Sequence, residues 1–316
     1  MNKTRRVFLN QISLMAATAA FCKPMASAAA VSKQINTIHS SKNAVTIYHT
    51  NDLLGNIEAA YKNTGGLSRI KAELEKQEIS GLLLDAGSFI NSATPLSQQK
   101  QVIAMMNSMN YHAAAVGKQE LSLGQDHLAS LAPFVKFTLL NCNYEFDDNL
   151  KKIVKPYIII NSGGFKVGVT AVGSRINNIK CSDAIESANT VAHLLKNDEK
   201  CDLVICLSHL PLMLEGTAPD NHKLAAQSKN IDMIIGGNND KLLINTKILS
   251  NKSKHEVILA QTAWNGMIMG RTIINFDSDK QKNGIRAKHF IPGTPVKSFA
   301  GSFSRLQLAK DLPLPV

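Results

Sequence analysis

Aromatic residues are scarce in this sequence, and its basic residues are not clustered. Phe, Trp and Tyr make up 5% of the 316 residues, and the formal net charge is +11. Four basic residues and no acidic one lie in the first 30 positions, so the rest of the chain carries 11 − 4 = +7. A nucleic-acid-binding surface needs basic residues gathered on one face. The scattered lysines therefore argue against a nucleic-acid partner.

Long apolar runs, C-x-x-C spacing and internal repeats are also missing. Beyond residue 30 no stretch approaches the ~20 apolar residues of a membrane-spanning helix, and no span is expected. Without C-x-x-C, no thiolate metal site of the usual spacing is expected. Cys201 and Cys206 flank one expected strand and are too far apart to bridge each other. We expect these two cysteines, with Cys142 and Cys181, to be buried free thiols rather than disulfides.

The first 30 residues have the features of an export signal. Thr4–Leu9 contains two adjacent arginines and is similar to the twin-arginine consensus, and the small residues Ala26–Ala28 form a cleavage signal after an apolar stretch. A general secretory leader that contains two arginines is the alternative. We expect residues 1–30 to be a signal peptide and residues 31–43 a linker. The mature chain is then exported, to the periplasm or the cell exterior.

Polar residues follow five expected strands at the point where each strand ends. The first strand leads to Asp52, and the others lead to Ser88, Glu120, His209 and Asp240. Small residues, mostly glycine, lie beside these positions. The carboxyl ends of strands in an α/β sheet are the usual place for functional groups. The sequence therefore predicts one composite site built from five strand ends.

The order of the expected elements indicates an α/β sandwich with mixed sheets. Strands and helices alternate up to about residue 141, and β-branched runs dominate from residue 156 onward. Hairpin turns are expected at Ser162–Gly164 and at Asn283-Gly284. We expect one domain at residues 44–291, followed by a C-terminal tail at residues 292–316.

Seven short motifs resemble those of the calcineurin-like metallophosphoesterases, specifically the exported 5′-nucleotidase type. They are, in order, Tyr48–Asp52, Gly65–Arg69, Leu83–Gly87, Val116-Gly117 with Glu120, Leu207–His209, Ile235–Gly237, and Gln261–Gly266 before Gly270. Each motif alone is weak, whereas their order and spacing together are specific. The resemblance implies a four-layer αββα sandwich with two mixed β-sheets. It also implies two metal ions where the strand ends of both sheets converge.

The metal ligands of that family are only partly present. The family's ligand motifs are D-x-H, G-D, G-N-H-[DE], a later His, and G-H-[ST]-H. By this resemblance Asp52 and His209 are retained metal ligands, and Gln119 replaces the His that protonates the leaving group. The altered ligand positions are Leu54, Ser88, Lys118, Asn238 and Asp240.

These substitutions remove the groups that two-metal hydrolysis needs. Leu54 cannot ligate a metal, and Ser88 lacks the carboxylate that both ions share. Lys118 repels them: a unit pair at about 4 Å and an effective dielectric of 20 is worth ~4 kcal/mol, and a dication feels about twice that. Gln119 has no proton to transfer near neutral pH, which removes roughly 10²–10⁴-fold in rate. We therefore expect a pseudoenzyme with no catalytic residue and no required cofactor.

Metal-dependent alternatives stay open. Asp52 and Asp240, with Ser88, could hold at most one divalent ion such as Mg²⁺, Ca²⁺ or Mn²⁺. A residual or altered phosphoesterase or nucleotidase activity would then persist. Asp52 and His209 also have purely structural interpretations, as a cap for loop N–H groups and as a satisfied buried histidine.

Binding without catalysis is the other set of alternatives. Phosphate or a nucleotide would be held by the donors at the family's phosphate position, which are Lys118, His209, Asn238 and Asn239. Lys118 could instead pair with Asp52 or Glu120 as a structural repair. Enzymes of this type usually carry a C-terminal nucleoside-binding domain, for which the ~25 residues after 291 are too few. An active paralogue or a separately encoded nucleoside-binding domain is therefore an expected partner.

Overall fold

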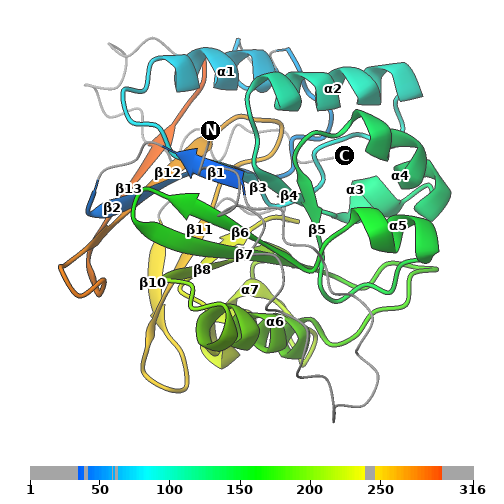
Figure 1. Cartoon of the computed structure of the whole chain (residues 1–316). Coiled ribbons are helices and arrows are strands. Elements are labelled where there is room, and N and C mark those ends of the chain that lie inside the picture. Colours follow the sequence, from blue (N-terminus) through cyan, green and yellow to red (C-terminus); the bar gives the residue numbers. More distant parts are fainter. Residues whose placement is uncertain (1–34, 39–41, 59, 61–62, 239–245, 294–316) are drawn as a thin grey trace, which may run out of the picture. The chain divides into compact units, whose positions relative to one another are not determined.

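Two β-sheets pack face to face in the computed structural model, and helices cover the outer face of each sheet (Figure 1). The described residues all belong to the unit Ser32–Val316 and comprise 35–38, 42–58, 60, 63–238 and 246–293. This arrangement confirms the four-layer αββα sandwich with two mixed sheets that the sequence predicted.

One sheet has six strands, four of them parallel. In spatial order they are β13 (Lys282–Phe290), β12 (Met269–Phe276), β2 (Ala44–Thr50), β3 (Leu82–Asp85), β4 (Ala113–Ala115) and β5 (Thr138–Leu140). The strands β2 to β5 run parallel, and β12 is antiparallel to both β2 and β13. All residues of β2, β3 and β4 are buried. These near-continuous apolar strands are typical of parallel strands that are covered on both faces.

The second sheet has seven strands and also combines parallel and antiparallel pairs. In spatial order they are β1 (Ile35–Ile38), β6 (Tyr157–Ser162), β7 (Phe165–Gly173), β8 (Leu203–His209), β9 (Met233–Gly236), β11 (Glu256–Gln261) and β10 (Lys247–Ser250). The four central strands β7, β8, β9 and β11 are parallel. Their carboxyl ends therefore point the same way.

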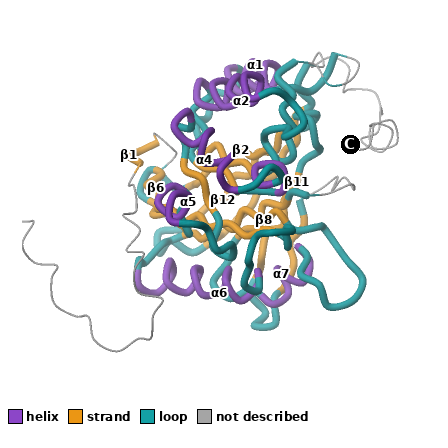
Figure 2. Tube along the Cα trace, turned by 90° about the vertical axis from the view of Figure 1, so that its right-hand side faces the viewer, coloured by secondary structure: helices purple, strands orange, loops and turns teal. Residues whose placement is uncertain are grey.

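The helices lie in two outer layers, and Figures 1 and 2 show the first two helices at the top and the last two at the bottom. One layer covers the six-stranded sheet and contains α1 (Leu67–Glu75), α2 (Leu96–Ser108), α3 (Lys118–Leu121), α4 (Gln125–Leu131) and α5 (Asp148–Ile153). The other covers the seven-stranded sheet and contains α6 (Ala184–His193) and α7 (Asn221–Gln227). Asp183 starts α6 by accepting from the N–H groups of Ile185 and Glu186, as an N-cap residue does. Short 3₁₀ and π turns follow α4 and α6, at Ala132–Phe134 and Leu194–Asp198.

Three apolar clusters hold the layers together. The middle cluster lies between the two sheets and includes Ile47, Leu84, Val169 and Ile205. The other two lie between each sheet and its helices, and the methionine stripe of α2 contributes Met106 to one of them. Burial of such side chains contributes roughly 1.5–3 kcal/mol each, before the cost of chain ordering. The carboxyl ends of the strands are thus presented by a rigid double sheet.

Two expectations about secondary structure were wrong. Ile35–Ile38, placed in the linker, instead forms β1 and pairs in parallel with β6, which is consistent with its β-branched residues. Asn283-Gly284 is not a hairpin turn, because Gly284 pairs with Asn275 inside the β12–β13 ladder. The turn lies before it, where the Asp277 carboxylate accepts from the N–H groups of Asp279 and Gln281. The turn is thus stabilised by an Asp side chain that accepts backbone N–H groups, and not by an Asn-Gly pair.

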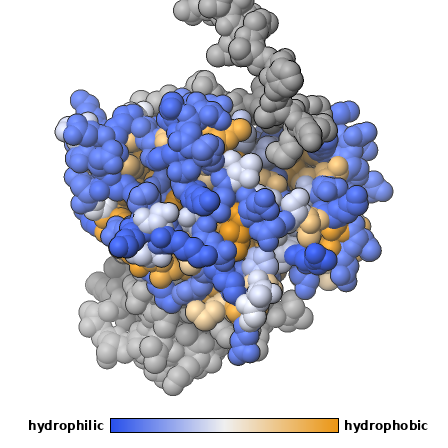
Figure 3. Space-filling model, turned by 90° about the horizontal axis from the view of Figure 1, so that it is seen from below, coloured by the Kyte–Doolittle hydropathy of each residue, from blue (hydrophilic) through white to orange (hydrophobic). Residues whose placement is uncertain are grey.

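One face of the described residues is mainly polar. Figure 3, which looks onto the α6 and α7 side, shows a largely hydrophilic face with small, separate apolar areas. Among the described residues no helix is long and apolar enough to cross a membrane. The four cysteines outside the first 30 residues are free, with Cys201 and Cys206 buried. The predicted signal peptide at 1–30, most of the linker and nearly all of the C-terminal tail lie outside the described residues.

His49 is a buried imidazole in β2 whose ring nitrogens have no hydrogen-bond partner in the structure. It packs against the neighbouring strand so closely that a Cβ added to Gly270 would lie 2.2 Å from the ring. Burial, with a smaller contribution from the charge of His289, lowers the pKa of His49 to about 3. Protonation of this ring is therefore incompatible with the folded packing.

We predict that His49 makes the fold sensitive to acid. Since its pKa is about 3 when folded and near 6.5 when unfolded, the unfolded chain binds the extra proton between these values. The free energy of unfolding should therefore fall as pH drops from 6.5 toward 3, by ~1.4 kcal/mol per pH unit from this residue. Urea unfolding at several pH values gives the slope of the free energy of unfolding against pH. This slope should be shallower by that amount in His49→Leu than in the wild type. The exposed His255 supplies the control, and an unchanged slope in His49→Leu would contradict the prediction.

Candidate functional site

Loops at the carboxyl ends of strands from both sheets meet at one place. The loop after β2 joins the loop after β3, since Asp52 N–H donates to the Gly87 carbonyl at 3.0 Å. The loop after β3 contacts the end of β8, where His209 Nδ1 lies 2.9 Å from the Ala86 carbonyl oxygen. The segment after β9 returns to the first loop, and Asn238 N–H donates to Asp52 Oδ2 at 2.9 Å. The strand ends that were predicted to form one site therefore lie together.

Four non-glycine residues of these loops have left-handed backbone conformations. Their φ angles are +48° at Asp52, +50° at Leu54, +55° at Ser88 and +56° at Asn238. Such conformations are uncommon outside glycine, and each costs of the order of 1 kcal/mol or more unless the surroundings impose it. All four are positions that the resemblance assigns to metal ligands. The surrounding loops therefore impose a strained backbone at each of these positions.

His209 is enclosed by glycines from three other loops. A Cβ added to Gly87, Gly117 or Gly237 would lie 3.0, 2.9 or 3.1 Å from atoms of the imidazole ring. Only residues without a side chain let these loops close around the ring. His209 itself is 1% exposed. The imidazole therefore has a single, well-defined position at the meeting point of the two sheets.

Hydrogen bonds also determine the protonation of His209. Its Nδ1 faces the Ala86 carbonyl, which can only accept, so Nδ1 carries the hydrogen. Its Nε2 lies 3.0 Å from Ser88 Oγ and must accept from that hydroxyl. Burial lowers the pKa of His209, against the smaller opposing effects of the Glu120 charge and the Ala86 carbonyl, and the ring is neutral near pH 7. A carbonyl bonded to one nitrogen is how proteins orient metal-binding histidines. Here the other nitrogen binds a serine hydroxyl.

Glu120 joins the loops after β3 and β4 from beneath the site. Its Oε2 accepts from the N–H groups of Ser88 and Gly117, at 3.0 and 2.8 Å, and its Oε1 accepts from Ile90 N–H at 3.2 Å. The side chain is fully buried. Burial raises the pKa of Glu120, and the nearby His209 and the three N–H donors oppose that rise. Glu120 is therefore a structural acid that sets the position of Ser88.

Asp52 serves the loops in a similar way. Its Oδ2 accepts from Asn51 Nδ2 and from Asn238 N–H, both at 2.9 Å. Its main-chain carbonyl accepts from Asn265 N–H at 2.7 Å. The carboxylate thus holds together segments that are 186 residues apart in sequence. This geometry agrees with the structural interpretation of Asp52 as a cap for loop N–H groups.

Lys118 and Gln119 begin the short helix α3 and make different contacts. Lys118 is exposed and forms no ion pair with any residue that the structure describes. The suggested pairing of Lys118 with Asp52 or Glu120 is therefore wrong, because both carboxylates accept backbone N–H groups instead. Gln119 Oε1 accepts from the N–H and hydroxyl of Ser92, at 3.1 and 2.7 Å. Its amide oxygen is thus committed to a neighbouring loop.

The described residues of the site do not fit a pair of dications. At the positions that the resemblance assigns to metal ligands they supply one carboxylate, Asp52, and one imidazole, His209, whose nitrogens already contact Ser88 and Ala86. Leu54 packs against an apolar cluster around Trp264. Within the described ranges no three His, Cys, Asp or Glu side chains are placed to hold a metal ion. Asn239 and Asp240, predicted as an anion donor and a ligand, lie outside those ranges.

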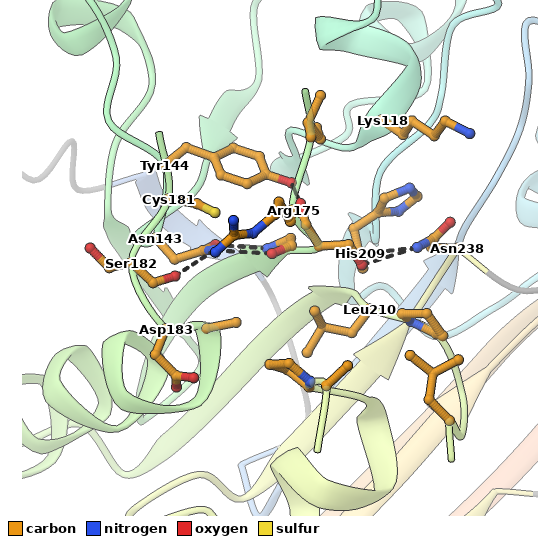
Figure 4. A pocket seen from close by; sticks show the side chains of 18 residues that line it. Lys118, Asn143, Tyr144, Arg175, Cys181, Ser182, Asp183, His209, Leu210 and Asn238 are labelled. Atoms are coloured by element: carbon orange, nitrogen blue, oxygen red, sulfur yellow. Dashed lines mark hydrogen bonds between the residues drawn. The ribbon is translucent and has the colours of Figure 1, made fainter. Parts of the chain in front are cut away.

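A pocket of about 740 Å³ opens beside this cluster (Figure 4). Lys118, His209 and Asn238 line one side, as Figure 4 shows, and Arg175 lies toward its centre. Asn238 is held there, because its Nδ2 donates to Ser174 Oγ at 3.2 Å. Three of the four predicted anion-binding residues therefore line a single pocket.

Sequence reasoning missed the contribution of the loop after β7. Arg175 lies in this loop, and Tyr144 packs beneath it, with its hydroxyl donating to the Ser174 carbonyl at 2.6 Å. A Cβ added to Gly173 would lie 2.1 Å from that hydroxyl. The signal was present, since Gly173-Ser174-Arg175 follows a β-branched run just as the other polar strand ends do.

Comparison with known proteins finds sequence similarity to phosphoesterases and 5′-nucleotidases. The trifunctional nucleotide phosphoesterase YfkN of Bacillus subtilis is 25% identical over 276 residues, which cover 74% of this chain and 18% of YfkN. The 5′-nucleotidase of Vibrio cholerae is 28% identical over 223 residues, which cover 62% of this chain and 40% of that enzyme. The sequence is thus similar to those of a nucleotide phosphoesterase and a 5′-nucleotidase over 62% to 74% of its length. No family model matches its sequence.

Solved structures support the fold of this phosphoesterase homologue. The 5′-nucleotidase precursor of Thermus thermophilus superposes with a TM-score of 0.70 at 20% identity, covering 79% of this chain and 54% of that one. The calcineurin-like phosphoesterase YfkN of Bacillus subtilis gives 0.62 at 21% identity, covering 80% and 91%. The chain spans less than half the length of the curated relatives described above.

We predict that Glu120 is essential for stability. Replacement by Ala leaves three buried N–H groups without an acceptor, at ~1–3 kcal/mol each, so the free energy of unfolding should fall by at least ~3 kcal/mol. Glu120→Gln keeps one oxygen that can accept these N–H groups, so its free energy of unfolding should fall by less. Urea unfolding of both variants tests this, with the exposed Glu75→Ala as control. A loss below ~1 kcal/mol in Glu120→Ala would show that the three bonds do not matter.

Proposed function

We propose that this 5′-nucleotidase homologue does not hydrolyse phosphoesters by the two-metal mechanism and instead binds a small phosphate-bearing molecule. The observation that carries the proposal is the contact of Ser88 Oγ with His209 Nε2, at 3.0 Å, where the family places a shared carboxylate and a metal ligand. A neutral hydroxyl neither offsets the repulsion of two dications nor bridges them strongly. The nitrogen that would bind a metal is instead bonded to this hydroxyl.

Electrostatics at the site supports the proposal. An ammonium group, Lys118, stands where the family has an amide. Burial chiefly, and the Lys118 charge to a smaller extent, lower the pKa of His209. The same cation that disfavours a dication favours an anion. Two opposite unit charges about 4 Å apart gain ~4 kcal/mol at an effective dielectric of 20. Asn238 adds a side-chain amide beside Lys118 in the same pocket.

The position of the leaving-group acid supports it as well. Gln119 has an amide that does not titrate, and its oxygen accepts two hydrogen bonds from Ser92. His209 is itself neutral and bonded at both nitrogens. Neither Gln119 nor His209 can therefore act as the imidazolium acid that the family uses to protonate the leaving group.

Export of the protein is part of the proposal. It is supported by the twin-arginine-like leader and by the family relationship to snake venom 5′-nucleotidases, such as that of Naja atra, 26% identical over 234 residues. Outside the cytoplasm, such a protein would bind phosphate-bearing solutes that the cell or its neighbours release.

We predict that the purified mature protein retains no divalent ion after growth with added Mn²⁺ and Zn²⁺. Elemental mass spectrometry measures this, and phosphomonoester and diester substrates should show no turnover. The variant Ser88→Asp/Lys118→Asn/Asn238→His restores family ligands around His209 and should retain about one ion per chain. One or two ions in the wild-type protein, together with hydrolysis, would overturn the proposal.

We predict that inorganic phosphate binds in the pocket and that Lys118 is required. Calorimetric titration should show binding that weakens with added salt, because an exposed charge pair is screened. Lys118→Ala should lower the affinity by about tenfold, which corresponds to one charge-assisted hydrogen bond. Lys151, exposed on α5 and outside the pocket, provides the matched control, Lys151→Ala. Absence of heat at millimolar phosphate would rule out the binding function.

A further inference from the structure

Arg175 is a second cation in the pocket that the family resemblance does not assign. It lies in the loop that follows β7, and it lines the same pocket as Lys118. Arg175 is exposed and, among the described residues, forms no ion pair. A guanidinium with no acidic partner on the wall of a pocket is well suited to bind a carboxylate or phosphate through two parallel N–H groups.

The two cations come from different sheets and stand at separate places in the pocket. Lys118 follows β4 of the six-stranded sheet, whereas Arg175 follows β7 of the seven-stranded sheet. Figure 4 shows Lys118 and Asn238 on one side and Arg175 nearer the centre, toward Ser182. A single inorganic phosphate is small compared with a pocket of about 740 Å³. The pocket therefore has room for a molecule that reaches both cations.

The wall of the pocket around these cations is largely apolar. Ile176, Leu210, Pro211 and Leu214 contribute to it. The acidic side chain in the lining is Asp183, whose carboxylate accepts the N–H groups of Ile185 and Glu186 at the start of α6. Pockets for organic ligands have this composition, a mainly apolar wall with a few charged groups that fix orientation. The uncharged body of a ligand would lie against the apolar residues.

We propose that the pocket selects organic molecules with two anionic groups at their ends, of the sugar bisphosphate class, one group bound by Lys118 and the other by Arg175. This inference rests on the proposed function, because the Lys118 end is the phosphate site described above. It adds a specificity residue, Arg175, and a ligand class. A monophosphate of the same sugar meets only one of the two cations.

Calorimetric titration with fructose 1,6-bisphosphate and fructose 6-phosphate tests the inference. The two ligands differ by one phosphate group, and the wild-type protein should bind the bisphosphate at least about tenfold more tightly. Arg175→Ala should abolish this preference and leave the affinity for fructose 6-phosphate unchanged. Lys118→Ala should lower the affinity for both ligands. Because both side chains are exposed, the variants should unfold thermally as the wild type does.

Asp183→Asn provides a matched variant on the same wall. Asn is also a good N-cap residue, so α6 should be retained while one negative charge is removed. The affinity for the bisphosphate should then rise, and more than that for fructose 6-phosphate. Equal affinity of the wild type for the two sugars, or an equal loss of both in Arg175→Ala, would overturn the inference while leaving phosphate binding intact. Absence of binding by both sugars and by phosphate would instead overturn the proposed function itself.

Discussion

The imidazole of His209 connects the two sheets of this protein at the point where its strand ends converge. The residue belongs to β8 of one sheet, and its ring bonds with Ala86 and Ser88 in the loop after β3 of the other. Three glycines pack around the ring, and the loops that carry them contact it closely because glycine has no side chain. The geometry of the site therefore depends on a polar contact across the sheet interface as well as on the apolar cluster between the sheets. A neutral imidazole suits this role, because burial disfavours its charged form.

Around this ring the loops are fixed by bonds within the protein, although the resemblance implies that several metal-ligand positions carry other residues. Asp52, Leu54, Ser88 and Asn238 have left-handed backbone conformations, although such conformations are strained for residues other than glycine. The two buried carboxylates of the site bond backbone N–H groups, so they remain necessary without an ion. Loss of a metal ligand need not loosen such a site, since each loop is also fixed by bonds within the protein. Bonds within the protein can therefore maintain the framework of the site independently of hydrolytic chemistry.

Sequence reasoning predicted the framework better than the pocket. The alternation of apolar runs and polar strand ends was sufficient to place Asp52, Ser88, Glu120 and His209 together, because the carboxyl ends of parallel strands meet at one edge. It failed where a local pattern was outweighed by pairing, as for Asn283-Gly284, which has a hairpin sequence but lies inside the ladder with β12. It also missed Arg175, because the role of that residue depends on which loops of the two sheets face each other. Contacts across the sheet interface leave no periodic trace in the sequence.

Positive charge at the site is common to the family and to this chain, although different groups carry it. In the family, dications attract the phosphate and activate water for attack upon it. In this chain Lys118 and Arg175 are fixed, monovalent cations carried by the protein, and neither can activate water as a metal does. In the proposed function, attraction for an anion is kept while the means of attack is lost. A covalently held cation also needs no ion from the surroundings, so anion binding would not vary with the supply of metals. That independence from the supply of metals is consistent with the proposed binding role.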